Sequence, residues 1–445
     1  MANSVTHEMI KTYQASLLKS SRLKALQNAA TNISVNEIAL NRQVLTETDH
    51  TFSNMLDDWP VTDQKSSGRC WMFAGLNLLR SAAMKKMNLT DFEFSQNFVL
   101  FWDKIERANF FLESIIETAG KDLEDRKVAH LLAGPVVDGG QWNMFVDIIE
   151  KHGLVPKTFM PETESSSNTR LLNTILNTKL RQAAAHIRAL CKDGASVDTV
   201  RIEKDKVLQA VYRILAIHLG DPPERFAWQW HDKEKGFHRD DEMTPAEFAK
   251  AYVMQSPTDY ICLVNDPRSS HPYGKTFTVE FLGSVVGADP VLYLNVEIER
   301  MKELTIKTLS DGEPVWLGCD MGKMVHRKLG IMDAGLYEYE LIYDTSLDMK
   351  KSERLEYHQS SMSHAMLFTG VDLVEGKPRR WRIENSWGDA VGKKGFFAMN
   401  DSWFDDFMYE IAVKKSYLSA SELAALEVPP IVLPPWDPMG ALAHD

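Results

Sequence analysis

The stretch DWPVTDQKSSGRCWMFAGLN, residues 58–77, places one thiol, that of Cys70, directly before an apolar run with helical spacing. From Cys70 to Met87 the apolar side chains recur every three to four residues, and Lys85 and Lys86 fall near the end, as is typical of a helix. The first turn of a helix favours an anion, because its N–H groups are unpaired there. The stretch therefore predicts a thiolate at a helix N-terminus.

Bulk properties narrow the class of protein. The chain has 445 residues, of which 44% are hydrophobic, and a formal net charge of −12. This acidic balance argues against a protein that binds nucleic acid through its overall field. No run of about 18 apolar residues is present, so no membrane span is predicted. The four cysteines form no C-x-x-C pair, which excludes zinc fingers and thioredoxin-type redox motifs. We expect no metal, no cofactor, no disulfide framework and a cytoplasmic location.

The sequence divides into four parts, which together predict an α+β fold. Residues 1–162 form an N-terminal arm and a helical half that carries Cys70. Residues 163–256 are predicted to be a helical insertion, helical throughout, because apolar residues recur there at helical spacing. Residues 257–428 contain short β-type runs separated by turn signals, as in an antiparallel sheet or barrel. Residues 429–445 are a proline-rich extended tail.

Both ends of the chain carry apolar side chains that need a partner. Near the N-terminus, Ile10, Tyr13 and Leu17 lie at helical spacing and predict an amphipathic helix on the body of the protein. In the tail, Trp436 and Met439 are difficult to place in solvent, which favours a docked tail over a disordered one.

A thiolate becomes an acyl-transfer nucleophile only with a base and a group that orients the base. His364 opens one strand-like run, and Asn385 closes another. Both positions are accessible ends of strands, where catalytic side chains can meet. The alternative for any single cysteine is a small buried apolar residue, and we assign that interpretation to the other three, which lie within apolar runs: Cys191, Cys262 and Cys319.

Residues 58–77 resemble the region around the nucleophile in papain-like cysteine peptidases. The same family is matched in order by Asp138-Gly139-Gly140, by His364-Ala365 and by Asn385-Ser386-Trp387-Gly388. The resemblance implies roles for each match. Cys70 would be the nucleophile, His364 the base and then the acid, and Asn385 the residue that orients the imidazole. Trp387 would shield the His364–Asn385 hydrogen bond from water. Gln64 and the Cys70 N–H would form the oxyanion hole. Gly139 and Gly140 would bind the substrate backbone.

Two departures from the family pattern occur together. Ser67 and Val137 stand where the family usually has two cysteines that form a disulfide. Their joint absence favours a reducing compartment. The nucleophile and the histidine are also 294 residues apart, against roughly 130–150 in secreted papain-like enzymes.

These features are similar to those of the branch that comprises bleomycin hydrolase and bacterial aminopeptidase C. The resemblance implies a thiol aminopeptidase that acts on peptides and bleomycin-type amides, a homohexamer, and a C-terminal arm that reaches the active site at Ala443. Two alternatives remain open: an endopeptidase of the same fold, and a non-catalytic protein that binds peptides or nucleic acid. Because the chain continues past Ala443 with His444 and Asp445, we expect it to trim its own end.

Overall fold

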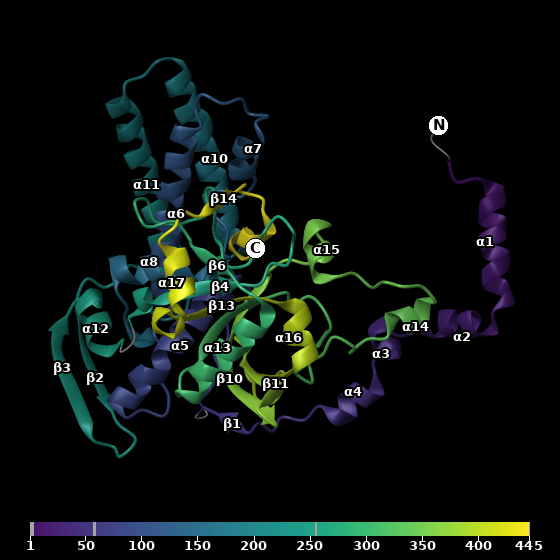
Figure 1. Ribbon diagram of the computed structural model, residues 1–445. Coiled ribbons are helices and arrows are strands. Elements are labelled where there is room, and N and C mark those ends of the chain that lie inside the picture. The colour runs from purple at the N-terminus through teal and green to yellow at the C-terminus, as the bar shows by residue number, and fades with distance from the viewer. Residues whose placement is uncertain (1–3, 57–58, 254–255, 445) are drawn as a thin grey trace.

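The computed structural model describes residues 4–56, 59–253 and 256–444, and it shows a helical part and a large sheet around one central helix (Figure 1). That helix, α5 (Cys70–Met87), contacts α6 and α8 of the helical part and β7 and β10 of the sheet. It is buried on nearly all sides, including Trp71, Phe73 and Leu79. A helix that is apolar all round belongs in a core, so α5 becomes the axis on which both parts pack.

The helical part of the chain also contains the two longest helices of the insertion. Helices α10 and α11 pack against each other and against α6, and Leu172, Leu176 and Leu180 are buried at this contact. The helices of the described chain are α1 (His7–Lys19), α2 (Ser21–Ala30), α3 (Val35–Ala39), α4 (Arg42–Glu47), α5 (Cys70–Met87), α6 (Gln96–Glu117), α7 (Arg126–Ala133), α8 (Trp142–His152), α9 (Glu164–Ser167), α10 (Arg170–Lys192), α11 (Val197–Leu219), α12 (Pro245–Tyr252), α13 (Ile298–Ser310), α14 (Tyr339–Tyr343), α15 (Lys351–Glu356), α16 (Asp401–Phe407) and α17 (Ala420–Leu426).

The sheet has twelve strands, and eleven of them follow the order β14-β5-β6-β4-β13-β7-β10-β11-β12-β9-β8, while β1 pairs with β10. Its central strands β7, β10 and β11 pair antiparallel. The strands of the described chain are β1 (Asn54–Met55), β2 (Phe226–His231), β3 (Phe237–Met243), β4 (Tyr260–Val264), β5 (Thr276–Val279), β6 (Tyr293–Asn295), β7 (Val315–Cys319), β8 (Val325–His326), β9 (Ile331–Met332), β10 (His364–Val374), β11 (Lys377–Glu384), β12 (Phe396–Asn400), β13 (Met408–Lys414) and β14 (Ile431–Leu433). The predicted α+β class is confirmed.

Two predictions about the outer parts of the chain are wrong. Residues 163–256 are not helical throughout, because β2 and β3 form an antiparallel hairpin within them. The N-terminal amphipathic helix forms as α1, but it does not lie on the body. Instead, α1 stands apart from the rest of the chain (Figure 1), and Ile10 and Tyr13 are exposed. Its apolar side chains therefore have no partner within the described single chain.

Candidate active site

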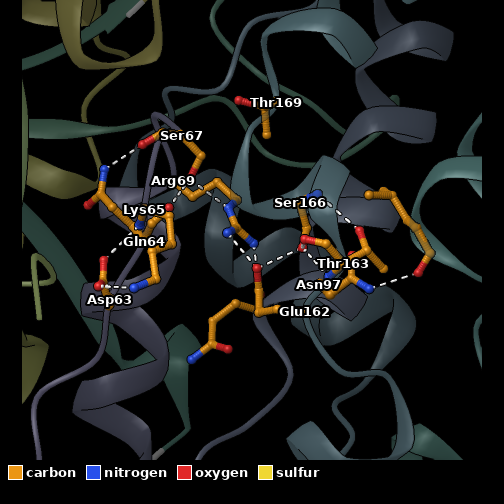
Figure 2. A network of polar contacts seen from close by, with 12 residues as sticks. Asp63, Gln64, Lys65, Ser67, Arg69, Asn97, Glu162, Thr163, Ser166 and Thr169 are labelled. Atoms are coloured by element: carbon orange, nitrogen blue, oxygen red, sulfur yellow. Dashed lines mark hydrogen bonds and ion pairs between the residues drawn. The ribbon is translucent and has the colours of Figure 1, made fainter.

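The loop before α5 is held by a buried arginine. The guanidinium of Arg69 is buried and donates to both carboxylate oxygens of Glu162, at 3.0 and 2.7 Å (Figure 2). Its Nε donates to the hydroxyl of Ser67, which in turn donates to the carbonyl of Gln64 at 2.6 Å. A bidentate arginine–carboxylate pair is among the most directional contacts in proteins. The loop therefore presents Cys70, the first residue of α5, in one fixed position.

Asp138 joins this loop to the glycine segment. Its carboxylate accepts from the N–H of Gly68 at 3.1 Å, from Lys104 at 2.6 Å and from Asn173 at 2.8 Å, as well as from the hydroxyl of Thr169. Burial alone would raise the pKa of Asp138, but the charge of Lys104 and these hydrogen bonds hold it well below its usual range. The two segments that carry Ser67 and Val137 are thus connected by an ionised carboxylate.

The glycine pair lies against the residue that follows the nucleophile. The indole Nε1 of Trp71 donates to the carbonyl of Asp138 at 2.7 Å. A Cβ at Gly140 would stand 2.4 Å from the Trp71 ring, so only glycine fits this close approach. Arg107 donates to the carbonyl of Gly139. The backbone of the glycine pair is therefore fixed beside α5.

His364 and Asn385 meet directly. The imidazole Nε2 lies 2.9 Å from the Asn385 Oδ1, which also accepts from the N–H of Ser386 at 2.8 Å. An amide oxygen can only accept, so Nε2 of His364 carries the hydrogen and Nδ1 is left with a lone pair. The Trp387 ring lies over the imidazole with their centroids 4.9 Å apart. This arrangement fixes both the tautomer and the orientation of the base.

The environment of His364 opposes its protonation. The pKa of His364 is lowered to about 4, because burial lowers it most, the hydrogen bond that its Nε2 donates to Asn385 raises it in part, and the charge of Arg327 lowers it further. The guanidinium of Arg327 stacks on the Trp387 ring, with its Cζ 4.6 Å from the ring centroid. An imidazolium in such a site needs a nearby anion, and a thiolate is the group that supplies one.

Strand β7 pairs with β10, the strand that carries the His364 imidazole. Cys319 of β7 pairs in register with His364 of β10, and its Sγ lies 3.6 Å from the His364 carbonyl oxygen. Burial raises the pKa of Cys319, and the charges of Asp320 and Cys70 raise it further. Helix α5, which begins at Cys70, packs on both β7 and β10, the strands that carry Cys319 and His364.

Gln64 links the nucleophile loop to the asparagine segment. Its backbone N–H donates to the Ser386 carbonyl at 2.8 Å, and its Oε1 accepts from the Ser386 hydroxyl at 2.6 Å. One N–H of its side-chain amide is bound to the Ser67 carbonyl at 2.5 Å. The second N–H of that amide remains for another acceptor, which is what an oxyanion donor requires.

The C-terminal arm is fastened before its end. Arg268 donates to both carboxylate oxygens of Asp437, at 2.8 and 3.2 Å, and also pairs with Asp266 at 2.6 Å. Beyond this clamp Met439, Leu442 and Ala443 are buried. Ala443 and His444 line a cavity of about 280 Å³ with Val137 and Arg107, both adjacent to the glycine pair. Asp445, the last residue of the expected trimming, lies outside the described residues.

One side-chain cluster in the described chain has the spacing of a metal site, but it does not fit a cation. Asp266, His271 and Asp437 place ligand atoms within 4.8 Å of one another. Arg268 already neutralises both carboxylates from within this cluster. A positive ion would have to displace a buried guanidinium, so the cluster is an anchor for the arm. In the part of the chain that the structure describes, no helix is both long and apolar enough to cross a bilayer.

The structure joins His364 to Asn385 and Gln64 to Ser386 by hydrogen bonds, packs Gly140 against Trp71 next to Cys70, and places Ala443 in the lining of the neighbouring cavity. Sequence reasoning missed Asp138 as a link and Arg327 as a neighbour of the base. The first lies within the glycine motif and could have been found from its charge. The second lies 37 residues before His364, in a loop with no motif, and only the fold reveals it.

A thiol at the start of a helix and an imidazole with a defined tautomer are the groups that acyl transfer requires, and together with the glycine segment they indicate a papain-like cysteine peptidase. Comparison with known proteins agrees. The model of the Peptidase C1-like family matches residues 4–440, and the chain belongs to this family.

The chain is similar over its whole length to curated relatives. It is 43% identical over 448 residues to aminopeptidase C of Lactobacillus delbrueckii subsp. lactis, covering 100% of both chains. It is 44% identical to human bleomycin hydrolase, covering 94% of each. The crystal structure of PepW from Lactobacillus rhamnosis has a TM-score of 0.97 and 45% identity, covering 99% of both chains. The predicted family, enzyme class and branch are confirmed.

Proposed function

We propose that the protein is a cytoplasmic cysteine aminopeptidase that removes N-terminal residues from peptides, and that it also hydrolyses bleomycin-type amides. The observation that carries this proposal is the position of the arm. Its buried end, at Ala443, lies beside the glycine segment that would bind the substrate backbone. We infer that an arm in this position blocks a substrate chain that continues on the amino side of the scissile bond. The names of the similar relatives, aminopeptidase C and bleomycin hydrolase, support the same activity.

The proposed reaction uses the groups in named roles. Cys70 attacks the scissile carbonyl while Nδ1 of His364 takes up its proton, and the imidazolium later gives this proton to the leaving amine. Asn385 holds the ring in the tautomer that leaves Nδ1 open. The Cys70 N–H and the second N–H of the Gln64 amide bind the oxyanion. Water then hydrolyses the acyl-enzyme with His364 as the base.

We also propose that the working form is a homohexamer. The exposed apolar face of α1, which includes Ile10 and Tyr13, stands away from the chain's own body and is suited to a second copy (Figure 1). In a hexamer, helix α1 of one chain would bury against another chain the apolar side chains that a single chain exposes. Sedimentation analysis of the full chain tests this, and a monomer at micromolar concentration would contradict it.

A peptide pair tests the activity. Each peptide is supplied with a free amino terminus and with an N-acetylated one, and release of the first residue is measured. We expect efficient hydrolysis of the free form and loss of kcat/KM by at least about 100-fold for the acetylated form, the size of a lost charged contact in a confined site. Equal hydrolysis of both forms would identify the endopeptidase alternative.

A further inference from the structure

A group of basic side chains lies on the loop that contacts Trp387, the neighbour of His364, and the proposed mechanism does not use it. His326 of β8 and its neighbours Arg327 and Lys328 line a cavity of about 400 Å³ together with Asn36 and Tyr337. The lining contains no acidic residue. Within the described chain no carboxylate lies within 4.0 Å of Arg327 or Lys328, although the protein as a whole carries a net charge of −12. Cations left unpaired in an acidic protein are suited to a ligand that supplies the negative charge.

The position of Arg327 relates this cavity to the reaction. The Arg327 Cζ lies 4.6 Å from the Trp387 ring centroid, which lies 4.9 Å from the His364 ring centroid. These two distances limit the separation of Arg327 from the imidazole to about 9.5 Å. The imidazole must protonate the leaving amine, so the residue released with that amine passes His364 and Trp387. One extended residue spans about 3.5 Å, so a substrate group one to three residues beyond the scissile bond comes within reach of the guanidinium.

The local hydrogen bonds keep the donors available. Nδ1 of His326 accepts from the N–H of Leu329 at 3.3 Å, so its Nε2 carries a hydrogen. The N–H of Gly392 donates to the Lys328 carbonyl at 3.1 Å, which places the exposed Lys393 next to this loop. The stacking of Arg327 on Trp387 orients its planar guanidinium, which matches the geometry of a carboxylate.

We propose that Arg327, with Lys328 and His326, forms a subsite on the leaving side of the scissile bond that binds the carboxylate of the substrate. The α-carboxylate of a dipeptide or tripeptide lies at this distance, so the protein would favour short peptides. This inference rests on the proposed peptidase function, because the subsite is defined relative to the bond that Cys70 attacks. It adds a recognition element for the far end of the substrate.

Three alanine-based substrates with free amino termini test the proposal: the dipeptide Ala-Ala, its C-terminal amide, and Ala-Asp amide. We expect the wild type to hydrolyse the acid with about tenfold higher kcat/KM than the amide, through KM. Arg327→Gln should reduce this ratio to near unity, and Arg327→Lys should retain most of it. If Ala-Asp amide exceeds Ala-Ala amide in kcat/KM by the same factor as Ala-Ala does, the site binds acidic side chains. That result would overturn the preference for short peptides.

The matched control is Arg239→Gln, because Arg239 is also exposed and stacked on an aromatic ring, Phe237, but lies on the hairpin of the insertion. It should leave the acid-to-amide ratio unchanged. If Arg327→Gln lowers kcat/KM equally for the acid and the amide, the arginine acts only by supporting Trp387, and the subsite is refuted. Failure of the peptidase function itself would appear separately, as absence of hydrolysis of every substrate by the wild type.

Discussion

Removal of the charge of Asp437 should release the arm from the active site. In Asp437→Asn the Oδ1 keeps the bond from Arg268 Nη2 at 2.8 Å, but an NH2 group replaces the Oδ2 that accepts from Nη1 at 3.2 Å, so that bond is lost. A charge-assisted bond contributes about 1.5–3 kcal/mol, so the loss of one costs about 2 kcal/mol. This raises the ratio of undocked to docked arm roughly 30-fold. The variant should fold, because Arg268 keeps its pair with Asp266 and asparagine can still accept from the Met439 N–H.

The assay compares kcat/KM for N-acetylated and free peptides. We expect hydrolysis of the acetylated form to rise by about 10- to 30-fold relative to the free form, because an undocked arm opens the amino side of the site. Asp241→Asn is the matched control, since Asp241 is exposed on the insertion hairpin and should leave the ratio unchanged. An unchanged ratio in Asp437→Asn, together with increased protease cleavage of the arm, would show that the docked arm does not select free amino termini.

Four further outcomes are expected. Cys70→Ser should lower kcat by several powers of ten with an unchanged oligomer, and residual activity within tenfold of wild type would contradict its role as nucleophile. Gln64→Ala should lower kcat about 10²- to 10³-fold, whereas a change confined to KM would assign it to ground-state binding. Intact mass over time should show loss of Asp445 or of His444-Asp445 from wild type, while Cys70→Ser keeps both, and an uncut, fully active wild type would refute trimming. Burial raises the pKa of Glu410 to about 8, above its unfolded value, so the wild type should lose roughly 5 kcal/mol of stability from pH 4.5 to 8. Glu410→Gln should lack this loss in urea unfolding, and parallel pH profiles would refute it.

Much of the fold was predictable from local patterns. The β-type runs that the sequence indicates after residue 256 form strands, among them β4, β7, β10 and β11. The strand β13 escaped prediction because it is buried on both faces and carries Glu410 in its middle. The hairpin strand β3, FHRDDEM, escaped for the opposite reason, since it is mostly exposed and polar and shows no apolar alternation. Its pairing with β2 is a tertiary contact that periodicity does not encode.

The residues of the candidate site also fall into those that the sequence indicates and those that only the fold reveals. Cys70, His364 and Asn385 each stand in a short motif at the end of an element, so their types and order indicate the chemistry. The contacts of Arg327 and Arg268 depend on loops that fold against distant segments, and no spacing in the sequence reports them. The N-terminal helix was predicted correctly, but its packing on the body of the protein was not. An apolar helix face indicates that some surface covers it, but not whether that surface belongs to the same chain.

The carboxylate of Asp138 has a consequence for how the protein matures. It ties the N–H of Gly68 to the glycine segment without a covalent bond. A disulfide at such a place must be formed by an oxidant and corrected by isomerisation, over seconds to hours, whereas a hydrogen-bonded carboxylate forms as soon as the segments meet. The newly made chain therefore needs no oxidoreductase to assemble its nucleophile loop, and the loop can open and reclose without damage. Thiol reductants, which protect Cys70 from oxidation, do not weaken this link.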